Sequence, residues 1–170
     1  MSGVFTNNWA GLKNSMILGG VSKEDVSDVY NVSGTRVYAS HLTTPLADIY
    51  AGYSYSTGVN NNYVRFGSSD TTPTAADIDL GTPWSSGVRY VSVVNGTRSW
   101  SGATASRTFS VVIQNTSDAA VTVREFGIFT GTSNGYCLLY RCVLDSPVTI
   151  ARYESATIEF TISQTISNPI

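Results

Sequence analysis

Four apolar runs in the second half of the chain determine its fold class: TFSVVIQ (108–114), VTVREFGIF (121–129), YCLLYRCVL (136–144) and TIEFTI (157–162). They are rich in β-branched and aromatic residues, which favour pleated strands. Short segments of turn-forming residues separate them, such as Asn115–Asp118. Strands joined by short turns run antiparallel, and this spacing is typical of a sandwich or barrel. We therefore expect an all-β fold, an antiparallel β-sandwich of jelly-roll-like type.

The region upstream of these runs predicts a further hairpin. Val88–Val94 is a strand candidate, and Asn95-Gly96 follows it directly. Asn-Gly between apolar runs is the strongest short-range signal for a two-residue hairpin, so Thr97–Ser101 is expected to be the return strand. The run 136–144 is expected to end near Asp145-Ser-Pro147. No repeat, linker or charge run divides residues 21–170, which we interpret as one sandwich domain.

Residues 1–20 have a different pattern from the rest of the chain. Trp9, Leu12 and Met16 follow helical spacing, and Gly19-Gly20 would end a helix. These residues predict a short N-terminal helix or arm. Together with Phe5 they form an apolar set that must be covered, either by the domain itself or by a neighbouring subunit. Our hypothesis is that Phe5, Trp9, Leu12 and Met16 are interface residues.

The charge of the chain excludes several function classes. Charged residues make up only 13% of the 170 residues and the net charge is −2, whereas a nucleic-acid-binding protein is expected to carry a clustered basic stripe. No run approaches the roughly 20 apolar residues of a membrane span, and the first residues lack the pattern of a signal peptide. We expect no nucleic-acid partner and no membrane partner. A surface so poor in charge suits either burial against neighbouring subunits or simple solubility.

The two cysteines predict free thiols. Cys137 and Cys142 lie five residues apart in one apolar run, and an odd spacing on a regular strand places side chains on opposite faces. They should therefore not form a disulfide with each other, and we expect them to be buried and reduced. With one histidine and no Cys-x-x-Cys, the chain has too few ligands for a usual zinc site.

The sequence contains no recognisable catalytic constellation. His41 is the only histidine, and no Gly-x-Ser-x-Gly motif accompanies it. Three glutamates on or near strands could line a cleft, but ion pairs with Arg124, Arg141 or Arg152 are the favoured interpretation of Glu125, Glu154 and Glu159. We expect no catalytic residues, and hence no enzymatic activity.

One loop holds three carboxylates, those of Asp70, Asp77 and Asp79. Calcium prefers oxygen ligands, but the spacing is not that of the helix-loop-helix calcium site, so we expect no metal and no cofactor. Aromatic residues are the remaining functional indication, because aromatic surfaces bind sugars or partner proteins. The alternative, that most of them form core or rim, stays open for Tyr50, Tyr53, Tyr55, Tyr63, Trp84 and Trp100.

Three phrases in this chain resemble small structural proteins of tailed bacteriophages. In the first, the strand at 64–67 ends in glycine and leads through Thr and Pro to an Asp-x-x-Leu segment ending at Leu80. The second is the strand 123–129, and the third is the stretch 139–150, which is followed by an acidic residue and the alternating strand at 158–162. The resemblance covers residues 63–164, and residues 1–62 have no counterpart in it.

The resemblance implies a virion component assembled in the host cytoplasm: a tail, neck, baseplate or fibre subunit, or a head decoration protein. Such proteins are usually β-sandwiches that act as oligomers on a symmetric particle. The implied partners are other virion proteins and copies of the chain itself. No catalytic residues come with the resemblance. The alternative function is a module of a phage fibre that binds a carbohydrate or a host receptor, with a host glycan as the possible ligand.

Overall fold

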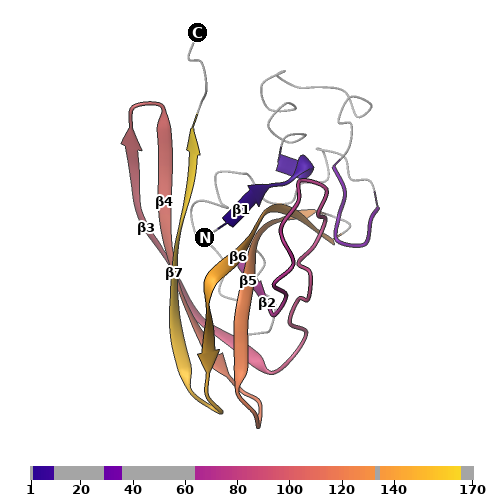
Figure 1. The fold of residues 1–170 in the computed structure, drawn as a ribbon, viewed down its shortest axis with the longest axis vertical. Helices are drawn as coiled ribbons and strands as arrows, with labels where there is room; N and C mark the ends of the chain where they lie inside the picture. Colours follow the sequence, from indigo (N-terminus) through magenta and orange to yellow (C-terminus); the bar gives the residue numbers. More distant parts are fainter. Residues whose placement is uncertain (1, 10–28, 36–63, 133–134, 166–170) are drawn as a thin grey trace.

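The fold is a sandwich of two antiparallel sheets, seen in a computed structural model that describes residues 2–9, 29–35, 64–132 and 135–165 (Figure 1). One sheet has the strand order β1-β6-β5-β2 and the other has the order β3-β4-β7. Their bounds are β1 (Ser2–Phe5), β2 (Val64–Gly67), β3 (Val88–Ser101), β4 (Thr104–Asn115), β5 (Val121–Thr132), β6 (Gly135–Ile150) and β7 (Ser155–Thr165). The prediction of an all-β sandwich is confirmed.

The chain crosses between the sheets twice in its second half. Strand β4 belongs to the three-stranded sheet, the β5–β6 hairpin to the four-stranded sheet, and β7 returns to pair with β4. The hairpin is therefore nested between two strands that pair with each other, which is the jelly-roll-like feature of the fold.

Aromatic rings from both sheets meet in the core. The rings of Phe126 in β5 and Phe160 in β7 are stacked with their centroids 4.0 Å apart, and Phe109 in β4 lies 5.3 Å from Phe160. All three side chains are at most 3% exposed. Removing a buried phenylalanine side chain typically costs about 3–5 kcal/mol, so this stack is a principal stabilising contact between the sheets.

The predicted hairpin at Asn95-Gly96 is wrong. Strand β3 runs without a break from Val88 to Ser101, and its register against β4 shifts between Asn95 and Arg98. The Asn-Gly pair therefore belongs to a bulge, because β4 provides partners on both sides of it. The hairpin turn is Gly102-Ala103, where Gly102 has a φ of 57°. A glycine with positive φ at the first central position suits a two-residue hairpin loop.

Strand β6 extends beyond its predicted end near Asp145-Ser-Pro147. It continues to Ile150, and its register against β5 jumps from the pair Glu125–Val143 to the pair Val123–Val148. Proline cannot donate a ladder hydrogen bond and is tolerated in strands at bulges. The irregular stretch therefore accommodates Pro147 without ending the strand.

The cysteines are free and fully buried, as expected, but the expected opposite faces are wrong. Cys142 pairs with Phe126 and Cys137 with Thr130, and the register shifts between Ile128 and Phe129. Five residue steps on β6 therefore lie against four on β5, which returns both thiols to the core face. Four strand steps of about 3.3 Å still hold the two cysteines too far apart for a disulfide.

The first residues form a strand that the sequence did not predict. Strand β1 pairs with β6, from Ser2 opposite Val143 to Phe5 opposite Tyr140, and a helical turn follows at residues 7–9. Residues 10–20 of the predicted helix or arm lie outside the described residues.

Candidate functional site

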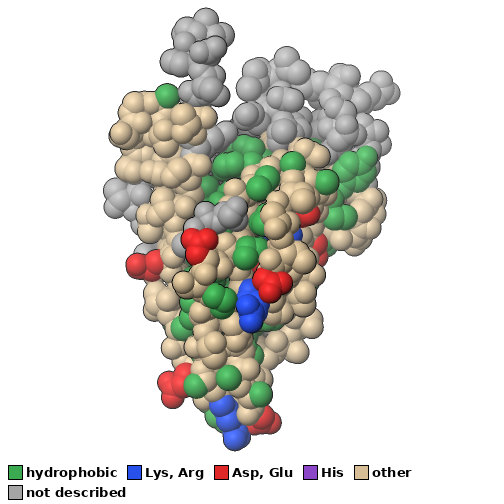
Figure 2. Space-filling model, in the orientation of Figure 1, with side chains coloured by type: hydrophobic (Ala, Val, Ile, Leu, Met, Phe, Trp, Pro, Cys, Tyr) green, Lys and Arg blue, Asp and Glu red, His purple; other side chains and the backbone are tan. Residues whose placement is uncertain are grey.

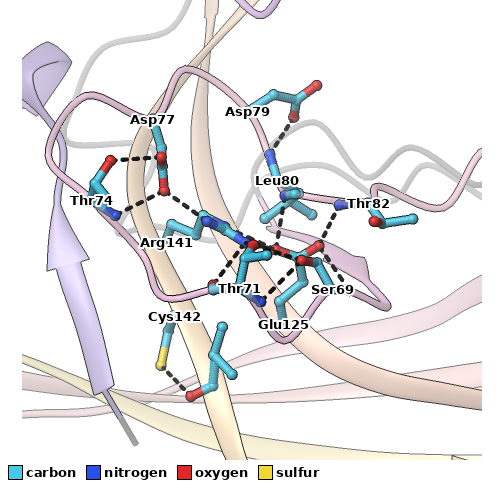
Figure 3. A network of polar contacts seen from close by, with 12 residues as sticks. Ser69, Thr71, Thr74, Asp77, Asp79, Leu80, Thr82, Glu125, Arg141 and Cys142 are labelled. Carbon is cyan, nitrogen blue, oxygen red and sulfur yellow. Dashed lines mark hydrogen bonds and ion pairs between the residues drawn. The ribbon is translucent and has the colours of Figure 1, made fainter.

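A buried carboxylate organises the face of the four-stranded sheet that points away from the core (Figure 3). Glu125 in β5 is 0% exposed. Its Oε1 accepts hydrogen bonds from the backbone N–H groups of Thr82 at 2.8 Å and Ser69 at 3.3 Å. Its Oε2 accepts from the N–H of Gly81 at 3.0 Å and from Arg141. One side chain of the sheet thus binds three backbone N–H groups of the segment that follows β2.

Arg141 in β6 supplies the balancing charge. Its Nε lies 2.9 Å from Oε2 of Glu125, and its Nη1 lies 2.8 Å from Oδ2 of Asp77. Its Nη2 donates to the carbonyl and the hydroxyl of Thr71, at 3.2 and 2.9 Å. Burial alone would lower the pKa of Arg141, but the hydrogen bonds and charges of Asp77 and Glu125 outweigh burial, so the pKa is raised overall. The guanidinium therefore stays charged and links Glu125 in the sheet to Asp77 and Thr71 in the loop.

Asp77 is held as an anion within this arrangement. Burial alone would raise its pKa, but hydrogen bonds from Thr74 and Arg141 lower it overall. Thr74 donates twice to the carboxylate, through its backbone N–H at 3.0 Å and its hydroxyl at 2.8 Å.

The pKa of Asp79 is shifted in the opposite direction, upward. Burial raises its pKa, and the hydrogen bond from the N–H of Leu80 and the charge of Arg65 offset only part of this rise. The pKa values of the two aspartates are thus shifted in opposite directions, because hydrogen bonds from Thr74 and Arg141 outweigh burial at Asp77 whereas burial outweighs its partners at Asp79.

Gly67, at the end of β2, has no room for a side chain. A Cβ at this position would lie 2.5 Å from Oε1 of Glu125 and 2.5 Å from the backbone carbonyl oxygen of Thr82. A backbone atom cannot move aside as a flexible side chain can. The strand end therefore needs glycine so that the loop can approach Glu125.

The arrangement is a structural clamp rather than a reactive centre. Both oxygens of Glu125 are occupied by donors, and the side chain has no exposed surface. A general base must instead present a free lone pair to a substrate proton. Asp77 is likewise committed to Thr74 and Arg141. Within the described ranges, no three His, Cys, Asp or Glu side chains are grouped closely enough to hold a metal ion.

The predicted interface residues lie partly within the described structure. The ring of Phe5 is 5.4 Å from that of Trp9 and 5.0 Å from that of Tyr140 in β6, and Trp9 packs against the core. For these two residues the structure shows contacts with their own domain, one of the two alternatives left open by the sequence. Leu12 and Met16 lie outside the described residues, and contact with a neighbouring subunit stays a prediction.

Asn8 has a structural role that the sequence did not reveal. Its side chain is 2% exposed and accepts a hydrogen bond from the N–H of Tyr30 at 2.7 Å. Its Nδ2 donates to the carbonyls of Tyr30 at 2.8 Å and Leu138 at 3.1 Å. Nothing local in the sequence indicates partners so distant along the chain. A cleft of about 420 Å³ lies beside it, lined by Asn7, Asn8, Tyr30, Gly34, Ala75, Ala76, Asp77 and Ile78.

The aromatic candidates divide between core and surface. Trp84 packs against the core, whereas Trp100, beside the β3–β4 turn, is 71% exposed. His41, Tyr50, Tyr53, Tyr55 and Tyr63 lie outside the described residues. Of the two candidates that the structure describes, Trp84 and Trp100, the second presents a large exposed aromatic surface.

Comparisons with protein-family models, curated proteins and solved structures find no match for this chain. Among the described residues, no helix has the length and apolar character needed to span a membrane. The class defined by the fold and the clamp is thus an antiparallel β-sandwich with an ion network that fixes one long loop.

Proposed function

We propose that the chain is a structural subunit of a tailed-bacteriophage particle, acting as an oligomeric tail, neck, baseplate or head-decoration component by protein–protein assembly. In this proposal its partners are other virion proteins and copies of itself, and it requires no cofactor or catalytic residue.

The clamp is the observation that carries the proposal. Each of the three phrases that resemble phage structural proteins contributes one charged member: Asp77 from the first, Glu125 from the second and Arg141 from the third. Segments far apart in the sequence thus form one unit in space (Figure 3). The three phrases are therefore parts of one structural unit, which supports treating them together as one resemblance.

The surface is also consistent with an assembly role. Charged side chains are few and scattered on the face drawn in Figure 2, among many uncharged ones. Interface cores are depleted in lysine and acidic residues, so a surface of this kind suits burial against other subunits.

A second candidate is a carbohydrate- or host-receptor-binding module of a phage fibre. The specific observation in its favour is Trp100, whose exposed ring is available for stacking on a sugar. Binding of the wild-type protein to a glycan array, together with loss of that binding in Trp100→Ala, would favour this candidate.

Immunogold electron microscopy of gradient-purified particles tests the leading proposal. The particles are those of the phage or prophage that encodes the chain, labelled with antibodies raised against the recombinant protein. We expect gold at one fixed place on the particle, which would also distinguish tail, neck, baseplate and head surface. Unlabelled intact particles, in a preparation whose denatured proteins also fail to react with the antibody, would overturn the proposal.

A further inference from the structure

The four sheet edges of the described structure differ in their protection. Strands β1 and β2 have only 4 residues each. Strand β3 is long, but its register shifts at Tyr90/Ser92 and again at Asn95/Arg98. Short strands and bulges are two of the devices by which proteins prevent an edge from pairing with another chain. Three of the four edges therefore carry a recognised form of protection.

Strand β7 has neither device. It runs for 11 residues and pairs with β4 from Ser155 to Thr165 without a register shift. It contains no proline or lysine, and Glu159 is its only charged residue. Among the described residues, only those of β4 pair with it. A long, regular and nearly uncharged edge presents a row of N–H and C=O groups to another strand.

The face beside the C-terminal half of this edge carries paired hydroxyl side chains. Thr108 in β4 pairs with Thr161 in β7, and their hydroxyls lie 2.8 Å apart. The same cross-strand contact joins Thr104 and Thr165 at 2.7 Å. These hydroxyls satisfy one another, so the face needs little rearrangement when a further strand continues the sheet.

We infer that β7 pairs antiparallel with β7 of a second copy, joining two three-stranded sheets into one sheet of six strands across a two-fold axis. The edge of β3 is interrupted by bulges and would not match β7 along its length. The edge that does match is β7 itself, and a self-complementary contact of this kind closes as a dimer. Like charges directly opposite each other are destabilising, so the axis should not lie at Glu159.

This inference deepens the proposed assembly function and rests on it for the expectation that copies of the chain meet. The test is sedimentation velocity of the full chain over a range of concentrations, using a matched pair of double variants. Thr161→Lys with Ser163→Lys places like charges along the β7 edge. Thr108→Lys with Ser106→Lys changes their cross-strand partners on the central strand β4. Both variants break the Thr108–Thr161 hydroxyl contact, and thermal unfolding checks that both remain folded.

We expect a wild-type dimer, a β4 variant that still dimerises, and a β7 variant whose dissociation constant rises at least about tenfold, equivalent to about 1.4 kcal/mol. A wild-type protein that stays monomeric throughout would overturn the inference. So would a β7 variant that dimerises like the wild type, or a β4 variant that dissociates as readily as the β7 variant. If the chain is found in particles yet is monomeric when isolated, the β7 contact fails and the assembly function stands. If the chain dimerises through β7 but is absent from particles, the β7 contact stands and the assembly function fails.

Discussion

Nη2 of Arg141 lies 2.9 Å from Oε2 of Glu125, and the glutamate side chain is 0% exposed. The residues lie 16 positions apart, on the neighbouring strands β5 and β6 of one hairpin. An ion pair out of contact with water is strongly destabilised when one partner is removed, because the other remains as an uncompensated buried charge. Two loop segments depend on this pair, through Asp77 and through the backbone N–H groups of Gly81 and Thr82.

Glu125→Gln should therefore destabilise the protein severely. The amide keeps the shape of the carboxylate but leaves Arg141 without one of its two charge partners and gives the loop N–H groups a weaker acceptor. We expect a loss of about 3–5 kcal/mol in the free energy of unfolding, measured by urea denaturation.

The matched control is Asp118→Asn. Asp118 forms an ion pair of the same 2.9 Å length with Arg152, but the two side chains are 83% and 57% exposed. Exposed pairs contribute under about 1 kcal/mol, so this variant should unfold nearly as the wild type does. Equal losses in the two variants would show that burial is not what makes the Glu125 pair important.

The pH dependence of stability should separate Asp77 from Asp79. The folded-state pKa of Asp77 lies below its ordinary value of 3.8. Its contribution is therefore present above pH 3.8 and is lost as the pH falls through the folded pKa. Asp77→Asn should lower the melting temperature at neutral pH and converge with the wild type in strong acid.

Asp79→Asn should do the opposite at neutral pH. Burial raises the folded-state pKa of Asp79 above 3.8, so the folded state binds this proton more tightly than the unfolded state does. That preference stabilises the protein fully below pH 3.8 and is lost as the pH rises through the folded pKa. The neutral amide should raise the melting temperature at pH 7 relative to the wild type. Thermal scans from pH 2 to pH 7 measure both variants, and shifts of the same sign at neutral pH would contradict this account.

Alternation and turn chemistry were sufficient to predict the strands around Phe109, Phe126 and Phe160. They failed where register is irregular. Asn95-Gly96 has the sequence of a hairpin turn, but β4 continues to pair beyond it, and that tertiary partner is not visible locally. The prediction that Cys137 and Cys142 lie on opposite faces is wrong for the same reason, because a bulge shifts the alternation of side chains by one residue.

The clamp was only partly predictable. Arg141 was one of three arginines considered for an ion pair with the strand glutamates, and the hairpin pairing selects it for Glu125. The sequence places Asp77 in a loop with two other carboxylates, but nothing in the sequence shows which face of the sheet that loop covers. Asn8 bonds to residues 22 and 130 positions away, and local pattern contains no information at such separations.

Both cysteines should be unreactive in the folded protein. Each is 0% exposed, and burial raises the pKa of Cys137 to about 12. The thiolate is the reactive form, so little of it is present at neutral pH. A thiol-specific reagent should label neither residue in native protein and both after denaturation. Rapid labelling before unfolding, or a disulfide between Cys137 and Cys142, would contradict the structure.

Adjacent asparagines test whether the first residues belong to the domain. Asn8 is buried and joins Tyr30 to Leu138, whereas the side chain of Asn7 is exposed. Asn8→Ala removes the acceptor of the part-buried N–H of Tyr30 and one of the two donors to the buried carbonyl of Leu138, the other being the hydroxyl of Thr6, and should cost about 1–3 kcal/mol. Asn7→Ala should be nearly neutral by the same denaturation measurement. An Asn8→Ala variant as stable as the wild type would indicate that residues 2–9 are an arm and contribute little to the stability of the domain.

Quantitative mass spectrometry of purified particles tests the assembly role most directly. Peptides of this chain are measured against those of the major capsid protein across a density gradient, before and after a high-salt wash. A structural subunit should be present at a constant ratio in every particle-containing fraction and should resist the wash. A ratio that varies between fractions, or peptides that stay with soluble protein and never with particles, would contradict the account.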